Sequence, residues 1–365
     1  MKTILSEQPA AADRAVPDQG VVPSAQDRDA ALGNDSQIAA ELVRRHRPHA
    51  VNHLQTGVAF ALWVLTALVI ALVPPTDAYL VKGEAQALGL AVILAALLGA
   101  LWLASRVWDT ASRWLGAWSP WWIATAVVTL AWETLTAKTG VLSPPYVPSP
   151  GQIIAEGWAD RTLLARSVGN SLLLLAVGIV IGGLAGLGTG LWMGWSKRAG
   201  YWLDPIVKYI GPVPTLAWIP IVFIAFPNSF SAAVFLVALT VWFPMAVTTS
   251  AGIRGVSREY FDVCQTLGAS SRFLIFKVSL PAALPNIFTG VFMALPTAFV
   301  TLTIAETLGV NSGLGWYINW KKGWSAYPSM YAAIALMVII CGSLLTAELA
   351  VRNRVLSWQK DLTRW

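Results

Sequence analysis

The chain has 365 residues and a formal net charge of +6, yet only 12% of its residues are charged and 56% are apolar. Soluble domains carry about 25% charged residues, so this composition excludes an ordinary soluble enzyme or binding module and favours a chain embedded in lipid. The basic residues lie at the ends of apolar segments, which argues against nucleic acid as a partner. Cys264 and Cys341 have no CxxC spacing and no neighbouring His, so neither a disulfide framework nor a metal site is expected.

The first segment, residues 1–42, is polar, rich in Ala, Pro, Gln and Asp, and has no hydrophobic periodicity. Such a composition predicts a disordered tail. The segment also lacks the apolar core that follows the basic start of a secretory signal. We therefore expect the tail to stay on the cytoplasmic side of a membrane.

Beyond the tail, the pattern predicts an all-α polytopic membrane protein. A helix of about 20 apolar residues crosses a hydrocarbon core of about 30 Å. The fifth of the segments that meet this requirement contains Pro212, Pro214 and Pro220, so we expect a broken or kinked span there. The eight predicted spans are residues 55–73, 85–104, 120–137, 168–195, 206–226, 231–250, 285–310 and 327–350.

The distribution of Lys and Arg predicts the orientation of these spans. Basic residues such as Arg45, Arg198 and Arg254 concentrate in the loops that share a side with the N-terminus, and fewer lie on the other side. By the positive-inside rule, both termini are expected in the cytoplasm. An even number of spans agrees with this N-in, C-in orientation.

A regular glycine pattern marks the fourth span, with Gly178, Gly182, Gly186, Gly190 and Gly194 at every fourth position. Small residues at this spacing let helix backbones approach closely. Static close packing is the favoured interpretation, and sliding of packed helices in a transporter is the alternative.

The loop between the sixth and seventh spans, residues 257–285, is too patterned for a simple connector. Residues 259–267 predict a short amphipathic helix that stops near Gly268, and Ser270 or Ser271 can start a second helix. Pro281 and Pro285 then lead into the membrane. A helix, a glycine and a second helix on the membrane surface are typical of a docking element, and an ordinary linker helix is the alternative.

Glu306 is an acidic residue inside the seventh span. A charge at the bilayer centre costs about 2.5–3.5 kcal/mol on insertion scales, so a carboxyl group held there usually faces a cavity. We predict that Glu306 lines or gates a translocation path, with a hydrogen-bonded structural role near a helix end as the alternative. Further candidates for the path are Pro212, Pro214, Trp218, Trp242, Phe243, Phe299, Thr301 and Thr303.

The 257–285 loop resembles the EAA loop of permease subunits of ABC importers. In that loop an acidic residue and two small residues, usually alanines, precede a glycine, and a Leu-Pro follows about a dozen residues later. The positions that match are Asp262 for the acid, Val263 and Cys264 for the small pair, Gly268 and Ala269 for the glycine step, and Leu280 and Pro281 for the closing motif.

Flanking motifs extend this resemblance over residues 147–365 and towards the nitrate, sulfonate, taurine and bicarbonate branch of the importers. Their order and spacing carry the resemblance. The motifs are Pro-Ser-Pro at 148–150, a glycine-rich span with a basic turn at 194–198, Leu-Asp-Pro at 203–205, Pro-x-Pro-x-x-Ala at 212–217, Ala-Glu-x-Leu-Gly at 305–309 and Gly-Leu-Gly at 313–315.

The resemblance implies a six-helix importer-type permease core within residues 116–365. Residues 43–115 then form two additional N-terminal transmembrane helices, which either dock a partner or lie at the periphery. The residues implied to couple the core to an ATPase are Glu259, Asp262, Val263, Cys264, Gly268, Ala269 and Arg272.

The function implied is that of the permease subunit of an ATP-driven importer in a bacterial inner membrane. Its implied partners are ABC ATPase subunits, a second permease copy in a homodimer and an extracytoplasmic solute-binding protein. No GxxxxGK[ST] motif occurs, so ATP and Mg are expected on the ATPase subunits, and this chain is expected to bind no cofactor and to be no enzyme. The solute implied is small, polar and anionic, of the nitrate, sulfonate, taurine or bicarbonate class, although related permeases also carry thiamine-precursor pyrimidines and aromatic acids.

A secondary transporter and a membrane enzyme are the two alternatives to the importer. A secondary transporter would have paired broken helices in inverted repeats and several intramembrane acids, whereas Glu306 is nearly alone. A membrane enzyme would need a converging set of catalytic side chains. Because His46, His49 and His53 all lie in one basic stretch beside the first span, no such set is expected.

Overall fold

The structure is a computed structural model that describes residues 53–76, 83–105, 109–142, 145–211 and 213–360. The tail predicted for residues 1–42 lies outside the described residues. In the part described, all regular secondary structure is helical, and this confirms the predicted all-α class.

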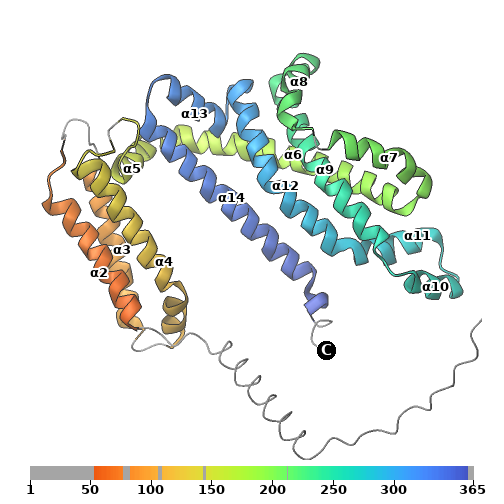
Figure 1. Cartoon of the computed structure of the whole chain (residues 1–365), viewed down its shortest axis with the longest axis horizontal. Helices are drawn as coiled ribbons and strands as arrows, with labels where there is room; N and C mark the ends of the chain where they lie inside the picture. The colour runs from red at the N-terminus through yellow and green to blue at the C-terminus, as the bar shows by residue number, and fades with distance from the viewer. Residues whose placement is uncertain (1–52, 77–82, 106–108, 143–144, 212, 361–365) are drawn as a thin grey trace, which may run out of the picture.

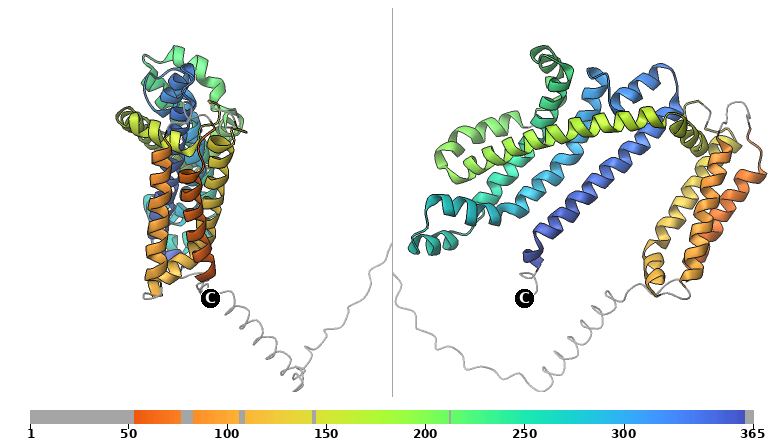
Figure 2. Two further views of the ribbon diagram at one scale, coloured as in Figure 1. Left: turned by 90° about the vertical axis from the view of Figure 1, so that its left-hand side faces the viewer. Right: turned by 180° about the vertical axis from the view of Figure 1, so that it is seen from behind.

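Three N-terminal helices pack together at one end of the molecule, as the views in Figures 1 and 2 show. They are α2 (His53–Leu72), α3 (Glu84–Ala104) and α4 (Asp109–Glu133), and α4 continues as a π-helical turn over Thr134–Lys138. Trp63 is buried between them, and its indole N–H donates to the carbonyl of Trp122 at 3.3 Å. The predicted third span therefore packs with the first two, and α5 (Pro150–Ala159) joins this group to the rest.

The larger part of the molecule is built on α6 (Arg161–Trp195), which crosses α9 (Ser229–Arg254) and lies against α12 (Leu280–Leu308). The glycines at every fourth position of α6, from Gly178 to Gly194, face α9. A Cβ atom added at Gly182 would strike the backbone of Ala238, and one added at Gly190 would strike that of Ala246. The every-fourth-residue pattern therefore lies where the two backbones approach most closely.

The predicted fifth span is broken in the structure. α7 (Lys197–Ile210) is followed by a 3-10 turn at Thr215–Trp218 and by α8 (Ile219–Ala225), and the two halves are bent by 88°. Prolines remove backbone donors and prevent a continuous helix, so the bend follows from the local sequence.

The loop of residues 257–285, named the coupling loop after its expected role, and α13 lie at opposite ends of the α9 and α12 pair (Figure 1). α9 leads into α10 (Arg258–Thr266), and the chain returns through α11 (Ser271–Phe273) and a π-helical stretch, Leu274–Ser279, into α12. α12 then ends at α13 (Leu314–Gly323). α14 (Tyr327–Val355) runs back towards the end that holds α10 and ends in a 3-10 turn, Ser357–Lys360.

Six helices in the described residues are long and apolar enough to cross a membrane, or seven if the bent pair counts as one span. This number is lower than the eight predicted. The segment that does not qualify is the predicted third span, residues 120–137, because its Trp and Thr residues and Glu133 lower its mean hydropathy. The qualifying helices are Gln55–Leu72, Glu84–Ala104, Arg161–Trp195, Ser229–Arg254, Ser271–Leu308 and Tyr327–Val355.

Candidate functional site

The coupling loop folds as its local sequence predicts. Gly268 adopts the left-handed conformation at φ +79°, and its N–H donates to the carbonyl of Gln265 at 2.9 Å. The N–H of Ala269 donates to the carbonyl of Cys264 at 3.0 Å, so the last carbonyls of α10 are satisfied by the turn. Ser270 then caps the next helix by accepting from the N–H of Phe273 at 3.4 Å.

Helix α10 presents two apolar faces, only one of which is covered by this chain. The ring of Phe261 packs edge-on against Trp195 of α6, with ring centroids 5.9 Å apart. On the other side, Tyr260, Val263 and Leu267 are 64%, 59% and 82% exposed. These three residues recur at helical spacing, so they form one apolar stripe at the surface.

The remaining predicted coupling residues surround this stripe. Glu259, Asp262 and Arg272 are exposed, whereas Cys264 and Ala269 are half-buried. The structure therefore places all the predicted coupling residues in α10 and in the turn and helix start that follow it.

The base of the loop is tied to three membrane helices through Arg254, the last residue of α9. Its guanidinium forms an ion pair with Asp204 of α7 at 3.0 Å and donates to the carbonyl of Met193 of α6 at 3.0 Å. Asp204 belongs to the Leu-Asp-Pro motif, for which the sequence alone predicts no role. An acidic residue close to the basic residues Lys197 and Arg198 was the available signal that Asp204 has an ionic partner.

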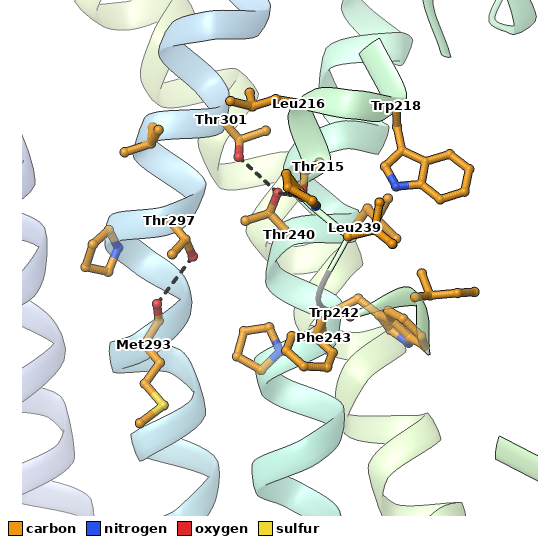
Figure 3. Close-up of a pocket in the computed structure, with 17 residues that line it drawn as sticks. Thr215, Leu216, Trp218, Leu239, Thr240, Trp242, Phe243, Met293, Thr297 and Thr301 are labelled. Carbon is orange, nitrogen blue, oxygen red and sulfur yellow. Dashed lines mark hydrogen bonds between the residues drawn. The ribbon is translucent and has the colours of Figure 1, made fainter. Parts of the chain in front are cut away.

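A cavity of about 530 Å³ lies between the 213–218 segment, α9 and α12 (Figure 3). It brings together Pro214, Trp218, Trp242 and Thr301 of the predicted path, and Phe243 also lines it. Pro212 lies outside the described residues. The predicted path residues Thr303, Phe299 and Glu306 are not among the residues that line this cavity.

Threonine hydroxyls connect the three walls of the cavity. The hydroxyl oxygen of Thr240 on α9 lies 3.0 Å from that of Thr215 and 3.0 Å from that of Thr301 on α12, as Figure 3 shows. Thr297, one turn before Thr301, donates to the carbonyl of Ala294 at 2.9 Å. Thr215, Thr240 and Thr297 were not among the predicted path residues, although the four-residue spacing of Thr297 and Thr301 was a usable signal.

The two tryptophans that line the cavity, Trp218 and Trp242, differ in the hydrogen bonds of their indole N–H groups. The indole N–H of Trp242 donates to the hydroxyl of Thr189 at 3.1 Å. The indole N–H of Trp218 is buried and has no hydrogen-bond partner among the described residues. No described residue that lines the cavity carries a charged side chain.

Glu306 occupies a different place, at the junction of α6, α12 and α13. It is 1% exposed, and its two carboxylate oxygens accept from the hydroxyl of Ser171 at 2.6 Å and from the N–H of Gly315 at 2.8 Å. The hydroxyl oxygen of Ser171 in turn accepts from the N–H of Leu314 at 2.8 Å. Glu306 thus holds the first turn of α13 against α6, an arrangement that matches the structural alternative and not the predicted path role.

A second polar link fixes α13 to the start of α6. The carboxylate of Asp160 accepts from the hydroxyl of Tyr317 at 2.6 Å and forms an ion pair with Lys321 at 2.5 Å. Partial burial raises the pKa of Asp160, but the hydrogen bonds from Lys321 and Tyr317 outweigh it and leave the pKa below its ordinary value. The two ends of α13 are therefore anchored by separate carboxylates.

Comparisons with known proteins show which families and proteins this sequence resembles. Residues 178–351 match the family model described as "Binding-protein-dependent transport system inner membrane component". The chain is 33% identical to the bicarbonate transport system permease protein CmpB of Synechococcus elongatus, over 36% of this chain and 48% of that protein. It is also 33% identical to the taurine transport system permease protein TauC of Escherichia coli, over 45% of this chain and 62% of that protein.

The nitrate import permease protein NrtB of Leptolyngbya laminosa is 33% identical over 38% of this chain and 54% of that protein. The chain thus spans about half to three fifths of the length of these relatives. Among solved structures, the MetNI methionine ABC transporter in an inward facing conformation matches with a TM-score of 0.47 and 19% identity, over 54% of this chain and 98% of that chain.

The matched region contains α9, the coupling loop, α12 and α13, together with most of α6 and α14. Residues 178–351 thus resemble the binding-protein-dependent transport system inner membrane component family, and the predicted resemblance to permeases of the nitrate, sulfonate, taurine and bicarbonate branch is confirmed.

Proposed function

We propose that this chain is the permease subunit of an ATP-driven importer, and that it forms the path for a small polar solute of the nitrate, sulfonate, taurine or bicarbonate class. The family match and the named relatives support this function. In this proposal, residues 116–365 contain the permease core and residues 43–115 form an N-terminal addition, against which α4 packs. The chain hydrolyses no ATP itself, and ATP and Mg bind to partner ATPase subunits.

The observation that carries the proposal is the uncovered apolar stripe of α10, formed by Tyr260, Val263 and Leu267. Exposed apolar surface next to charged residues marks a protein contact. A groove in an ATPase subunit would cover this stripe, and the acid Asp262 would meet a basic group of that subunit. Phe261 and Trp195 on the opposite face would pass the movement of the docked helix to α6.

The proposed assembly contains two permease copies, two ATPase subunits and an extracytoplasmic solute-binding protein. The multi-pass chain lies in an inner membrane with α10 and both termini on the cytoplasmic side. The clustering of Lys and Arg at the end of the molecule that holds α10, as at Arg254, Arg258 and Arg354, supports this orientation.

Gentle extraction of the tagged chain from its native membrane, followed by mass spectrometry of co-purifying proteins, tests the proposal. We expect a stoichiometric P-loop ATPase with the wild type and its loss with Asp262→Lys. Gly268→Val should also release the ATPase, because a non-glycine residue in the left-handed conformation costs about 1–2 kcal/mol and distorts the end of α10.

Ser257→Lys is the matched control, because Ser257 is exposed and its side chain makes no capping hydrogen bond although it is the N-cap residue of α10. It adds a positive charge near α10 and should leave the ATPase bound. If Asp262→Lys and Gly268→Val both retain the ATPase and full transport, α10 is not the docking element. If the wild type purifies without an ATPase and still transports, the importer assignment itself fails.

A further inference from the structure

The cavity between the 213–218 segment, α9 and α12 carries information about the solute. Its volume of about 530 Å³ falls in the range of about 300–1,000 Å³ that is typical of sites for organic ligands. Most of its lining is apolar or aromatic, including Leu239, Trp242, Phe243, Met293 and Val300. A bare inorganic anion would leave most of this wall without a partner.

The polar groups of the cavity are also few and largely occupied. Each threonine hydroxyl has a single proton, and the proton of Thr297 goes to the backbone of its own helix. The hydroxyls of Thr215, Thr240 and Thr301 bond to one another, and Thr240 also lies within hydrogen-bond distance of the carbonyl of Leu236. Few hydrogen-bond donors therefore remain for an inorganic anion, whose oxygens need donors in every direction.

One donor is free of such competition. The indole N–H of Trp218 is buried without a partner in the part of the chain that the structure describes. A buried donor without an acceptor is costly, so a small rotation of the indole that turns this N–H towards a ligand oxygen in the cavity would remove that cost. The cavity thus offers one strong polar contact beside an extended apolar wall.

We propose that the cavity selects an organic solute with one polar head group and an apolar portion, as in an organosulfonate, over inorganic anions such as nitrate and bicarbonate. This inference rests on the proposed permease function and narrows its solute class. The head group accepts from the indole N–H of Trp218, while the apolar portion packs against Trp242 and Phe243. Burial of each additional methylene should tighten binding roughly fourfold.

Cysteine protection in the full-length chain, in lipid nanodiscs, tests this selection without requiring the ATPase or the binding protein. Thr297→Cys places a thiol on the cavity wall, and Cys341→Ala removes one native thiol. The rate at which a methanethiosulfonate reagent modifies Cys264 of the coupling loop is the internal control. Both sites are read by mass spectrometry in the presence of methanesulfonate, butanesulfonate, benzenesulfonate, nitrate or bicarbonate.

We expect butanesulfonate and benzenesulfonate to protect the introduced thiol while Cys264 reacts at an unchanged rate. The half-protecting concentration should fall roughly fourfold per methylene from methanesulfonate to butanesulfonate. Adding Trp242→Ala should flatten this dependence, and adding Trp242→Phe should retain most of it. Nitrate and bicarbonate should give no protection at the same concentrations.

Protection by nitrate or bicarbonate equal to that by butanesulfonate would overturn the inference, as would a half-protecting concentration independent of chain length or an absence of protection by any sulfonate. None of these results would contradict the proposed function, because that function is tested separately by whether an ATPase co-purifies with the chain. Conversely, loss of the ATPase assignment would leave a measured ligand preference for the cavity.

Discussion

The contact between Glu306 and the start of α13 leads to a prediction with a defined magnitude. Glu306→Leu removes both acceptors and leaves the N–H of Gly315 and the hydroxyl of Ser171 buried without partners. Each unsatisfied buried donor costs about 1–3 kcal/mol, so the variant should lose about 2–6 kcal/mol of unfolding free energy. Glu306→Gln keeps one oxygen, so only one donor is orphaned and about 1–3 kcal/mol should be lost.

Thr303→Val is the matched control on the same helix. The hydroxyl of Thr303 donates to the carbonyl of Phe299 within its own helix at 2.8 Å, so its removal leaves no donor without a partner. We expect a change of about 1 kcal/mol or less. Equilibrium unfolding by denaturant in detergent micelles, followed by tryptophan fluorescence, measures all three variants.

Ser171→Ala completes a double-mutant cycle with Glu306→Gln. Because the two side chains share one hydrogen bond, their effects should fall short of additivity by about 0.5–3 kcal/mol. Additive effects, or a Glu306→Leu variant no less stable than Thr303→Val, would refute the structural role. Unchanged stability of Glu306→Gln together with altered transport would instead restore Glu306 to the path.

Two further predictions concern helix packing and pH. Gly182→Leu should destabilise the chain by at least about 1–3 kcal/mol, because its side chain would strike the backbone of Ala238, whereas Gly183→Leu points into open space and should be tolerated. Equal yields of folded protein for both variants would contradict the close approach of α6 and α9. The lowered pKa of Asp160 contributes stability that is present above its ordinary pKa and is lost as pH falls through the folded-state value. The denaturant concentration at the unfolding midpoint of the wild type should therefore fall as the pH is lowered below about 4, and Asp160→Asn should remove this fall. An identical pH profile for the two proteins would mean that the ion pair with Lys321 contributes nothing.

Local chemistry made the coupling loop predictable. The glycine at Gly268 and the serine at Ser270 act within a few residues of their own positions, so the end of α10 and the start of α11 follow from sequence alone. The positions of the long apolar helices were predictable for the same reason, since a run of apolar residues is a local property.

The third span shows where hydropathy stops being informative. Tryptophan and threonine lower the mean hydropathy of α4, yet Trp122 accepts from Trp63 and the helix packs with α2 and α3. Packing between helices depends on partners that a hydropathy window does not contain. The family resemblance implied two added helices, whereas α2, α3 and α4 pack together as three in the structure.

Glu306 illustrates a contact that no local pattern encodes. Its partner Ser171 lies 135 positions earlier in the chain, and only the crossing of α6 with α12 brings the two together. The lining of the cavity likewise depends on contacts between segments that are distant in the sequence. Trp242 and Thr301 were predicted by residue type, but Thr215 and Thr240 join them only because of the faces that α9 and α12 turn towards each other. Helices that are apolar all round do not reveal that face in their sequence.

A photo-crosslinking amino acid at Val263, in the middle of the exposed stripe of α10, tests the central claim most directly. In native membranes the importer account predicts an adduct with a P-loop ATPase, identified by mass spectrometry. The same probe at Phe261, which packs against Trp195 within this chain, should give no such adduct. A transport-competent chain that shows no ATPase adduct at Val263 would contradict the account.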